Sequence, residues 1–150
     1  MLYTHDRAII LNDLANSYAL EMRYSKAIAR YKEALALYIA LAKKEPLNYG
    51  IHIAHVFSNL SVIYFNLEKK READAFHQHS LKMHRALVKN NLAKYGVGLA
   101  CCLIEGVFYL NQHSLTLYEA EGVLYNVRGE EQAEQLLEAV WELRKRRVKG

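Results

Sequence analysis

The fold of this chain is decided by residues 14–34, which read LANSYALEMRYSKAIARYKEA. Apolar side chains recur there at spacings of three and four, which is the period of an α-helix with one buried face. The small residues Ala15 and Ala27 stand on either side of a polar break at Arg23. Two helices that pack closely need small side chains where their axes approach. The stretch therefore predicts a hairpin of two helices.

The same hairpin recurs after 46 residues. Residues of matching size fall in register as the pairs Tyr3–Tyr49, Ala8–Ala54, Leu14–Leu60, Tyr18–Tyr64 and Ala27–Ala73. Tyr95, Ala100 and Leu103 continue the register into a third unit, in which Glu119 replaces the small residue of the second helix. Self-similarity at a fixed period is the mark of a repeat architecture. We expect a single domain over 1–150, with repeats over about 1–46 and 47–92, a degenerate unit over 93–128 and a capping helix over 130–147.

About seven helices follow from these periods. Their expected ranges are 6–22, 26–44 after a turn at residues 23–25, 49–67, 70–89, 93–111, 115–127 and 130–147. The first helix should bury Leu11, Leu14 and Tyr18, and the second should bury Ile28, Tyr31, Leu35, Tyr38 and Ala42.

Composition agrees with an all-α class. The 150 residues include one proline and seven glycines, so the breakers of regular structure are few. The formal net charge of +4 arises mainly from residues 144–149, and the remainder is close to neutral. The most apolar stretch, Val97–Leu110, is short and interrupted by Glu105, so we expect no membrane span. Adjacent Cys101 and Cys102 are a poor disulfide pair, which indicates a reducing, cytoplasmic setting.

Catalytic chemistry finds little support in the sequence. Seven histidines are present, but His77 with His84 and His52 with His55 share helix faces without a third ligand at helical spacing. The two cysteines lie in an apolar helix, unlike a reactive thiol. Phosphate loops, nucleophile elbows and acidic metal clusters are absent from the sequence. We therefore expect no enzyme, no cofactor and no metal site.

The hairpin signature resembles that of the tetratricopeptide repeat family. The resemblance lies in Leu14-Ala15-x-x-Tyr18 followed by Ala27, Tyr31 and Ala34, and again in Leu60-Ser61-x-x-Tyr64 followed by Ala73, His77 and Ser80. The usual repeat has about 34 residues. Longer units of the present kind are similar to those of kinesin light chain and of bacterial regulatory proteins. The resemblance implies a right-handed superhelical stack of antiparallel hairpins whose first helices line a concave, peptide-binding groove.

The groove residues would be those that the buried stripes leave free on the first helices. They are Asn12, Asp13, Asn16, His55, Ser58, Asn59, Val62, Asn66, Glu105 and Phe108, with Ile104, Asn111 and Gln112 beside them. An asparagine amide both donates and accepts, so it can pair with any peptide backbone. Asn59 matches the concave asparagine of kinesin-light-chain-like repeats, whereas Asp13 and Glu105 do not. The lysines and arginines of the chaperone-type carboxylate clamp are not reproduced, so a chaperone tail is disfavoured as the partner.

These observations predict an interaction module or adaptor that binds a protein or peptide segment. Two alternatives stay open at this point. One is a homodimer formed through the first helix pair or through the helix that carries Trp141. The other is contact with nucleic acid through residues 144–149, against which stands the ordinary preference of cationic side chains for the end of a helix.

Overall fold

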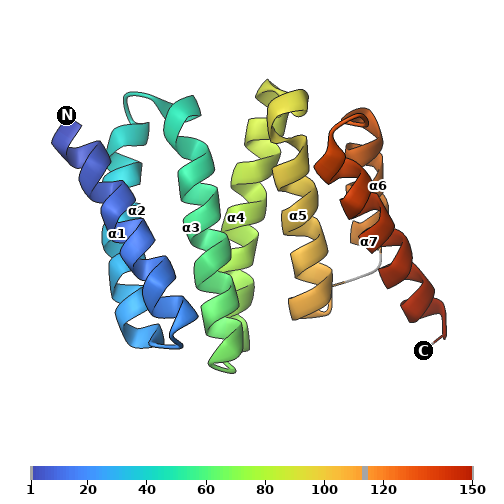
Figure 1. Ribbon diagram of the computed structural model, residues 1–150, viewed down its shortest axis with the longest axis horizontal. Coiled ribbons are helices and arrows are strands. Elements are labelled where there is room, and N and C mark those ends of the chain that lie inside the picture. Colours follow the sequence, from blue (N-terminus) through green and yellow to red (C-terminus); the bar gives the residue numbers. More distant parts are fainter. Residues whose placement is uncertain (1, 113–114, 150) are drawn as a thin grey trace. The chain divides into compact units, whose positions relative to one another are not determined.

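The computed structural model describes residues 2–112 and 115–149, and these are helical with short turns and no strand (Figure 1). The helices are α1 (Leu2–Leu20), α2 (Tyr24–Ala42), α3 (Pro46–Asn66), α4 (Lys70–Asn90), α5 (Leu92–Leu110), α6 (Leu115–Asn126) and α7 (Glu131–Lys149). The predicted all-α class and the seven helices are confirmed. The chain forms two compact units that meet between Met83 and His84. The prediction of a single domain stays a prediction.

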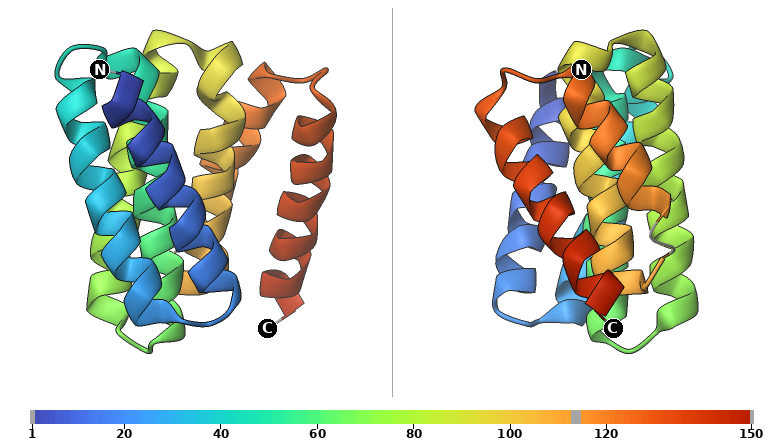
Figure 2. Two further views of the ribbon diagram at one scale, coloured as in Figure 1. Left: turned by 60° about the vertical axis from the view of Figure 1, so that its left-hand side comes forward. Right: turned by 90° about the vertical axis from the view of Figure 1, so that its right-hand side faces the viewer.

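The first unit is built on the α1–α2 hairpin. These helices lie side by side in both views of Figure 2, and α3 packs against α2. Ala15, Ala27 and Ala73 are fully buried, and the Ser61 hydroxyl donates to the Ala73 carbonyl over 2.7 Å. The small residues therefore lie where the helices approach one another, as the sequence predicts.

The predicted buried stripes need two corrections. Leu14 is 39% exposed, although its spacing indicated a core position. On α2 the buried line is Ala27, Tyr31, Ala34, Tyr38 and Leu41, while Ile28, Leu35 and Ala42 are only partly buried. The reason is that the helices touch along their alanines, so the larger residues beside that line lie at the edges of the contact.

The turns that close the first two hairpins have the same backbone. Met22 and Glu68 both adopt a left-handed conformation, with φ of 59° and 60°. In each turn the next amide, of Arg23 or Lys69, donates over 2.9 Å to the carbonyl of Tyr18 or Tyr64. This pattern ends many helices. The expected turn at residues 23–25 was wrong, because α2 already begins at Tyr24.

The joints between hairpins also correspond. Pro46 is the first residue of α3, where its missing amide hydrogen costs nothing. One repeat later, Asn91 precedes α5 and its side-chain oxygen accepts from the Lys94 amide over 3.0 Å. The cap satisfies one of the free amides at the start of the helix.

The second unit shows how the third repeat departs from the first two. Ala120 is the fully buried small residue of α6, one position later than the register of Ala27 and Ala73 requires. Glu119 is consequently exposed, and both of its oxygens accept from Arg85 over 3.2 and 2.8 Å. The helix is also short, at 12 residues. The second helix of this unit thus differs from α2 and α4 by a one-residue slip of its buried small residue.

The basic C-terminal stretch contributes to the packing of α7. Arg147 donates to the carbonyls of Gln112 and Val107 over 3.0 and 3.2 Å, and to the Asn111 side-chain oxygen over 3.1 Å. Arg144 lies 4.2 Å from the centre of the Tyr118 ring and forms an ion pair with Glu121. Both arginines thus tie α7 to neighbouring parts of its own unit.

The helix α5 is long and apolar enough to cross a membrane, by length and composition alone. This test tolerates charged residues such as Lys94 and Glu105, so the expectation of no membrane span stays a prediction. Nine of its residues are buried inside the protein, namely Tyr95, Gly96, Leu99, Ala100, Cys102, Leu103, Gly106, Val107 and Leu110. A buried core helix passes the same test.

Candidate functional site

A pocket of about 360 Å³ opens in the first unit between α1, α2 and α3. Its lining mixes amides, tyrosines and aliphatic side chains: Asn16, Ala19, Leu20, Tyr24, Tyr31, Asn59, Val62, Ile63 and Asn66. Both α1 and α3 are first helices of their hairpins, and α2 adds the two tyrosines. The pocket therefore combines successive repeats.

A hydrogen-bonded triad connects the three helices at this pocket. The Tyr31 hydroxyl donates to the Asn16 side-chain oxygen over 2.5 Å, and the Asn59 amide donates to the same oxygen over 3.5 Å. Burial raises the pKa of Tyr31 to about 12, and the hydrogen bond from Asn59 offsets part of that rise. The protonated phenol donates to Asn16 and holds its amide in a fixed orientation.

Other residues that line the pocket combine polar and aliphatic side chains. The Asn66 amide donates to the Tyr24 hydroxyl over 3.4 Å, which joins the end of α3 to the start of α2. Leu20 is 87% exposed beside them, and Val62 is half-buried. A side chain entering here would meet aliphatic surface framed by amide and hydroxyl groups.

Four residues predicted for the groove line this pocket together: Asn16, Asn59, Val62 and Asn66. Three others from the first unit, Asn12, Asp13 and His55, lie on the same helices but are not part of its lining. Ser58 is directed elsewhere, because its hydroxyl lies 2.6 Å from the Ser80 hydroxyl on α4.

The remaining predicted residues belong to the second unit. Glu105 is half-buried on α5, and burial raises the pKa of its carboxyl group. Phe108 is exposed, and Ile104 is half-buried. Asn111 ends α5 in a left-handed conformation with φ of 51° and accepts from Arg147, so it is a structural residue.

Sequence reasoning missed the two tyrosines of the pocket. Tyr31 was assigned to the core, and its ring is indeed buried, but its hydroxyl reaches Asn16. Tyr24 was placed in a turn. Both could have been found from the rule that a tyrosine hydroxyl at the core needs a hydrogen-bond partner. The asparagines of the neighbouring first helices are the partners that the sequence offers.

A cluster of rings lies toward the start of α1 and α3. The Tyr49 hydroxyl is 3.1 Å from His5 Nδ1, and the His52 ring stacks on Tyr38 at 4.9 Å with 9° between the planes. Burial lowers the pKa of His52, and the nearby His5 lowers it further. Among the described residues no group of three or more histidines, cysteines or carboxylates is placed to hold a metal ion.

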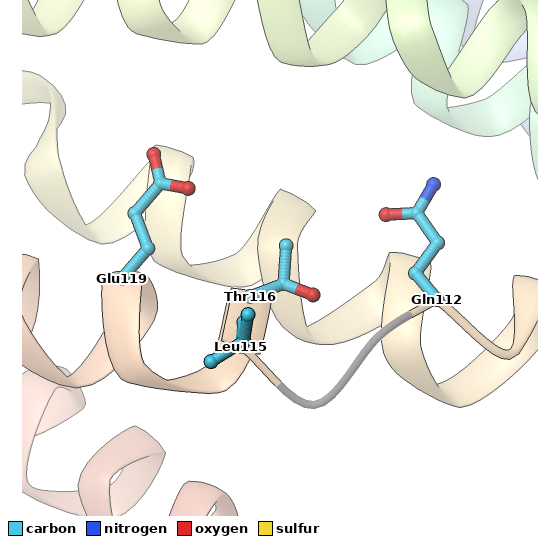
Figure 3. Close-up of a pocket in the computed structure, with 4 residues that line it drawn as sticks. All are labelled: Gln112, Leu115, Thr116 and Glu119. Carbon is cyan, nitrogen blue, oxygen red and sulfur yellow. The ribbon is translucent and has the colours of Figure 1, made fainter.

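A second pocket, of about 420 Å³, is lined by Gln112, Leu115, Thr116 and Glu119 in the second unit (Figure 3). Glu119 is already engaged by Arg85. The backbone carbonyl of Gln112 accepts a hydrogen bond from Arg147. The one charged side chain of this lining thus has a partner in the fold, and the first pocket, which gathers several polar side chains from three helices, is the better candidate.

Paired antiparallel helices with corresponding turns and joints define a helical-repeat protein. Residues 53–93, which cover most of α3 and all of α4, match the tetratricopeptide repeat family. The match covers one repeat of the chain and supports the assignment to this family that the sequence signature predicts. A search of curated proteins found no match. The longer-repeat likeness to kinesin light chain stays a prediction.

Proposed function

We propose that the chain binds an extended peptide segment of a partner protein in the pocket formed by α1, α2 and α3. The family is in general one of protein–protein interaction modules, and an all-helical repeat is typically a scaffold rather than an enzyme. The observation that carries the proposal is the meeting of Asn16, Asn59 and Asn66 with Tyr24 and Tyr31 in one pocket.

The hydrogen-bonding groups that Asn16 and Asn59 leave unused favour a peptide backbone as the ligand. The Asn16 oxygen is used twice within the protein, but its amide nitrogen has no partner among the described residues. Asn59 uses its nitrogen, and its oxygen is likewise without a partner in that part of the chain. A free donor beside a free acceptor complements the C=O and N–H of a peptide.

Preorganisation should strengthen such binding. The Tyr31 hydroxyl fixes Asn16 before the ligand arrives, so little rotamer freedom is lost on binding. The aliphatic rim of Leu20 and Val62 would then accept an apolar side chain of the same peptide. The expected ligand is an extended segment with an apolar residue beside its anchored peptide group.

Peptide display tests the proposal without a known partner. Peptides selected on the wild-type protein should lose roughly tenfold or more in affinity for the Asn16→Ala/Asn59→Ala double variant, because two backbone hydrogen bonds are removed. Affinity is measured by fluorescence anisotropy, and circular dichroism checks that helicity is kept.

Asn90→Ala is the matched control, since Asn90 is an exposed asparagine at the end of α4. This variant should bind the selected peptides like the wild type. Equal affinity of the wild type and the double variant would place the peptide site elsewhere and overturn the proposal.

A further inference from the structure

The face of α1 that turns away from its own hairpin carries exposed apolar side chains. Tyr3 is 89% exposed, Ile10 is 64% exposed and Leu14 is 39% exposed. At about 100° per residue these three fall within roughly 40° of one another on the helix. Ala8 and Ala15, which are fully buried, lie on a different side. We call the stripe of Tyr3, Arg7, Ile10, Leu14 and Glu21 the outer face of α1.

This face does not overlap the peptide pocket. Asn16 meets α2 and α3 through Tyr31 and Asn59, and His5 meets α3 through Tyr49. Both residues lie roughly 100° or more around α1 from the line of Ile10 and Leu14. A partner on the outer face would therefore leave Asn16 free for peptide.

Spacing along the outer face suits pairing with another helix. From Tyr3 to Leu14 its residues recur at intervals of four, three and four, and Glu21 follows seven residues after Leu14, which is the period of a helix–helix seam. The backbone amide of Glu21 donates to the carbonyl of Ser17 over 3.2 Å, so the helical hydrogen-bond pattern extends to Glu21. Aliphatic residues at the middle and charges toward the ends are the usual order of a helix interface.

The charges of the outer face are self-complementary. Arg7 is exposed and has no ion-pair partner among the described residues, and Glu21 contacts only the exposed Arg23. They stand seven residues before and seven residues after Leu14. When two such helices run antiparallel about a twofold axis at Leu14, Arg7 of each faces Glu21 of the other.

A contact between the outer face of α1 and the exposed face of α7 in another copy is disfavoured. That face is charged, with Glu131, Glu138 and Glu142 followed by Lys145 and Arg146, all exposed. Docking the apolar stripe of α1 against it would desolvate those charges without apolar compensation. A contact between the outer faces of α1 in two copies of the chain avoids this desolvation of charged groups.

We propose that the outer face of α1 is the contact by which two copies of this chain form a closed, twofold-symmetric dimer. Leu14 packs on Leu14 at the axis with Ile10 of each copy beside it, and Arg7 pairs with Glu21 across the interface.

The direct test is the mass in solution, by sedimentation equilibrium up to the highest concentration the protein tolerates. The wild type should approach twice the chain mass of 17.3 kDa. Leu14→Asp and Ile10→Asp should raise the dissociation constant by roughly tenfold or more, because each places a carboxylate in the contact. Ile39→Asp is the control, since Ile39 is 44% exposed but lies on α2.

Charge reversal tests the antiparallel register. Arg7→Glu and Glu21→Arg should each weaken the dimer, and the double variant should recover wild-type association. The proposal is overturned by a single-chain mass at every concentration, by a dimer that survives Leu14→Asp, or by growth beyond two chains. The peptide-binding measurement uses Asn16 and Asn59, so either proposal can fail without the other.

Discussion

Arg147 shows how a side chain near the end of the chain can close the end of another helix. Its guanidinium donates to two carbonyls and one amide oxygen around the last turn of α5. Val107 is in the last turn of α5, where the final carbonyls of a helix have no partner within it, and a cation is also favoured there by the helix dipole. The basic stretch at residues 144–149 is thus partly a structural device.

Replacing Arg147 by alanine should destabilise the second unit by about 1–2 kcal/mol, because three charge-assisted hydrogen bonds to partly exposed groups are lost. Urea unfolding followed by circular dichroism measures the change. Arg146→Ala removes the same charge from the neighbouring, exposed position and should shift the midpoint little. Equal effects of the two variants would contradict the structural role of Arg147.

His52 should make the first unit less stable in acid. Its pKa is lowered in the folded protein by burial and by His5, so the folded state disfavours the protonated ring. A group with a lowered folded pKa contributes its full stability above the unfolded value, near 6.5, and loses it as the pH falls below that value. We expect the urea midpoint to fall between neutral pH and about pH 5.

His52→Phe keeps a ring against Tyr38 but cannot be protonated, so the fall in its midpoint should be smaller than in the wild type. His79→Phe, on an exposed position of α4, is the matched change outside the cluster and should preserve the wild-type fall. An identical pH response of the wild type and His52→Phe would rule out this origin.

At the scale of elements, each hairpin turn contains one residue in an unfavourable backbone conformation. Met22 and Glu68 hold left-handed backbones without being glycine. Met22→Gly should therefore stabilise the protein by up to about 1 kcal/mol, since glycine adopts this conformation without a steric penalty. Lys43→Gly is the control, because φ of Lys43 is −59° and glycine gains nothing there. Thermal unfolding that ranks the two variants in the opposite order would contradict this account.

The approach of α1 to α2 depends on Ala27, which is fully buried. Ala27→Leu should cost about 1–3 kcal/mol, because the added side chain has no space between the helices. Ala29→Leu adds the same atoms to the same helix at an exposed position and should be nearly neutral. Chemical denaturation of both variants makes the comparison.

The elements themselves were predictable because their signals are local and repeated. The 46-residue register placed Ala27 and Ala73 at the contacts, and Pro46 and Asn91 at the joints. The buried line of α2 was harder to predict, since periodicity gives a broad stripe and only packing decides that Ala34 is buried while Leu35 lies at the edge. The slip to Ala120 was hidden because one inserted residue breaks the register that revealed the other repeats.

The candidate site was predictable only in part. Asn16, Asn59, Val62 and Asn66 followed from their place on the first helices. Ser58 and Asn111 did not, because hydrogen bonds to Ser80 and Arg147 engage them elsewhere, and such pairings depend on side-chain directions that a single sequence does not contain. Tyr31 was missed because it was assigned to the core alone. Its ring is buried there, while its hydroxyl reaches the pocket and donates to Asn16.

At the scale of the whole molecule, the net charge of +4 has a local source whose cations differ in role. Arg144 and Arg147 are engaged in the fold, whereas Lys145 and Arg146 are exposed. Lys145→Gln/Arg146→Gln should keep the wild-type unfolding midpoint while shortening retention on a polyanion column, because half of the net charge is removed. Unchanged retention would show that the exposed tail cations do not govern contact with polyanions.

Two surfaces on one helix would also act together. The outer face of α1 and the pocket at Asn16 lie on different sides of it, so the proposed dimer would present two peptide sites. A partner carrying two suitable segments would then be held more tightly than either segment alone.

The matching turns at Met22 and Glu68 make the chain extensible. The backbone leaves residue 22 and residue 68 in the same conformation, and the residue that follows makes the same hydrogen bond in both places. A duplicate of residues 23–68 spliced in after Glu68 would begin and end on geometry that the chain already contains, with Ser61 meeting Ala27 as it now meets Ala73. The protein could thus be lengthened by whole repeats, each bringing its own copies of Tyr24, Tyr31, Asn59 and Asn66, without a new kind of junction.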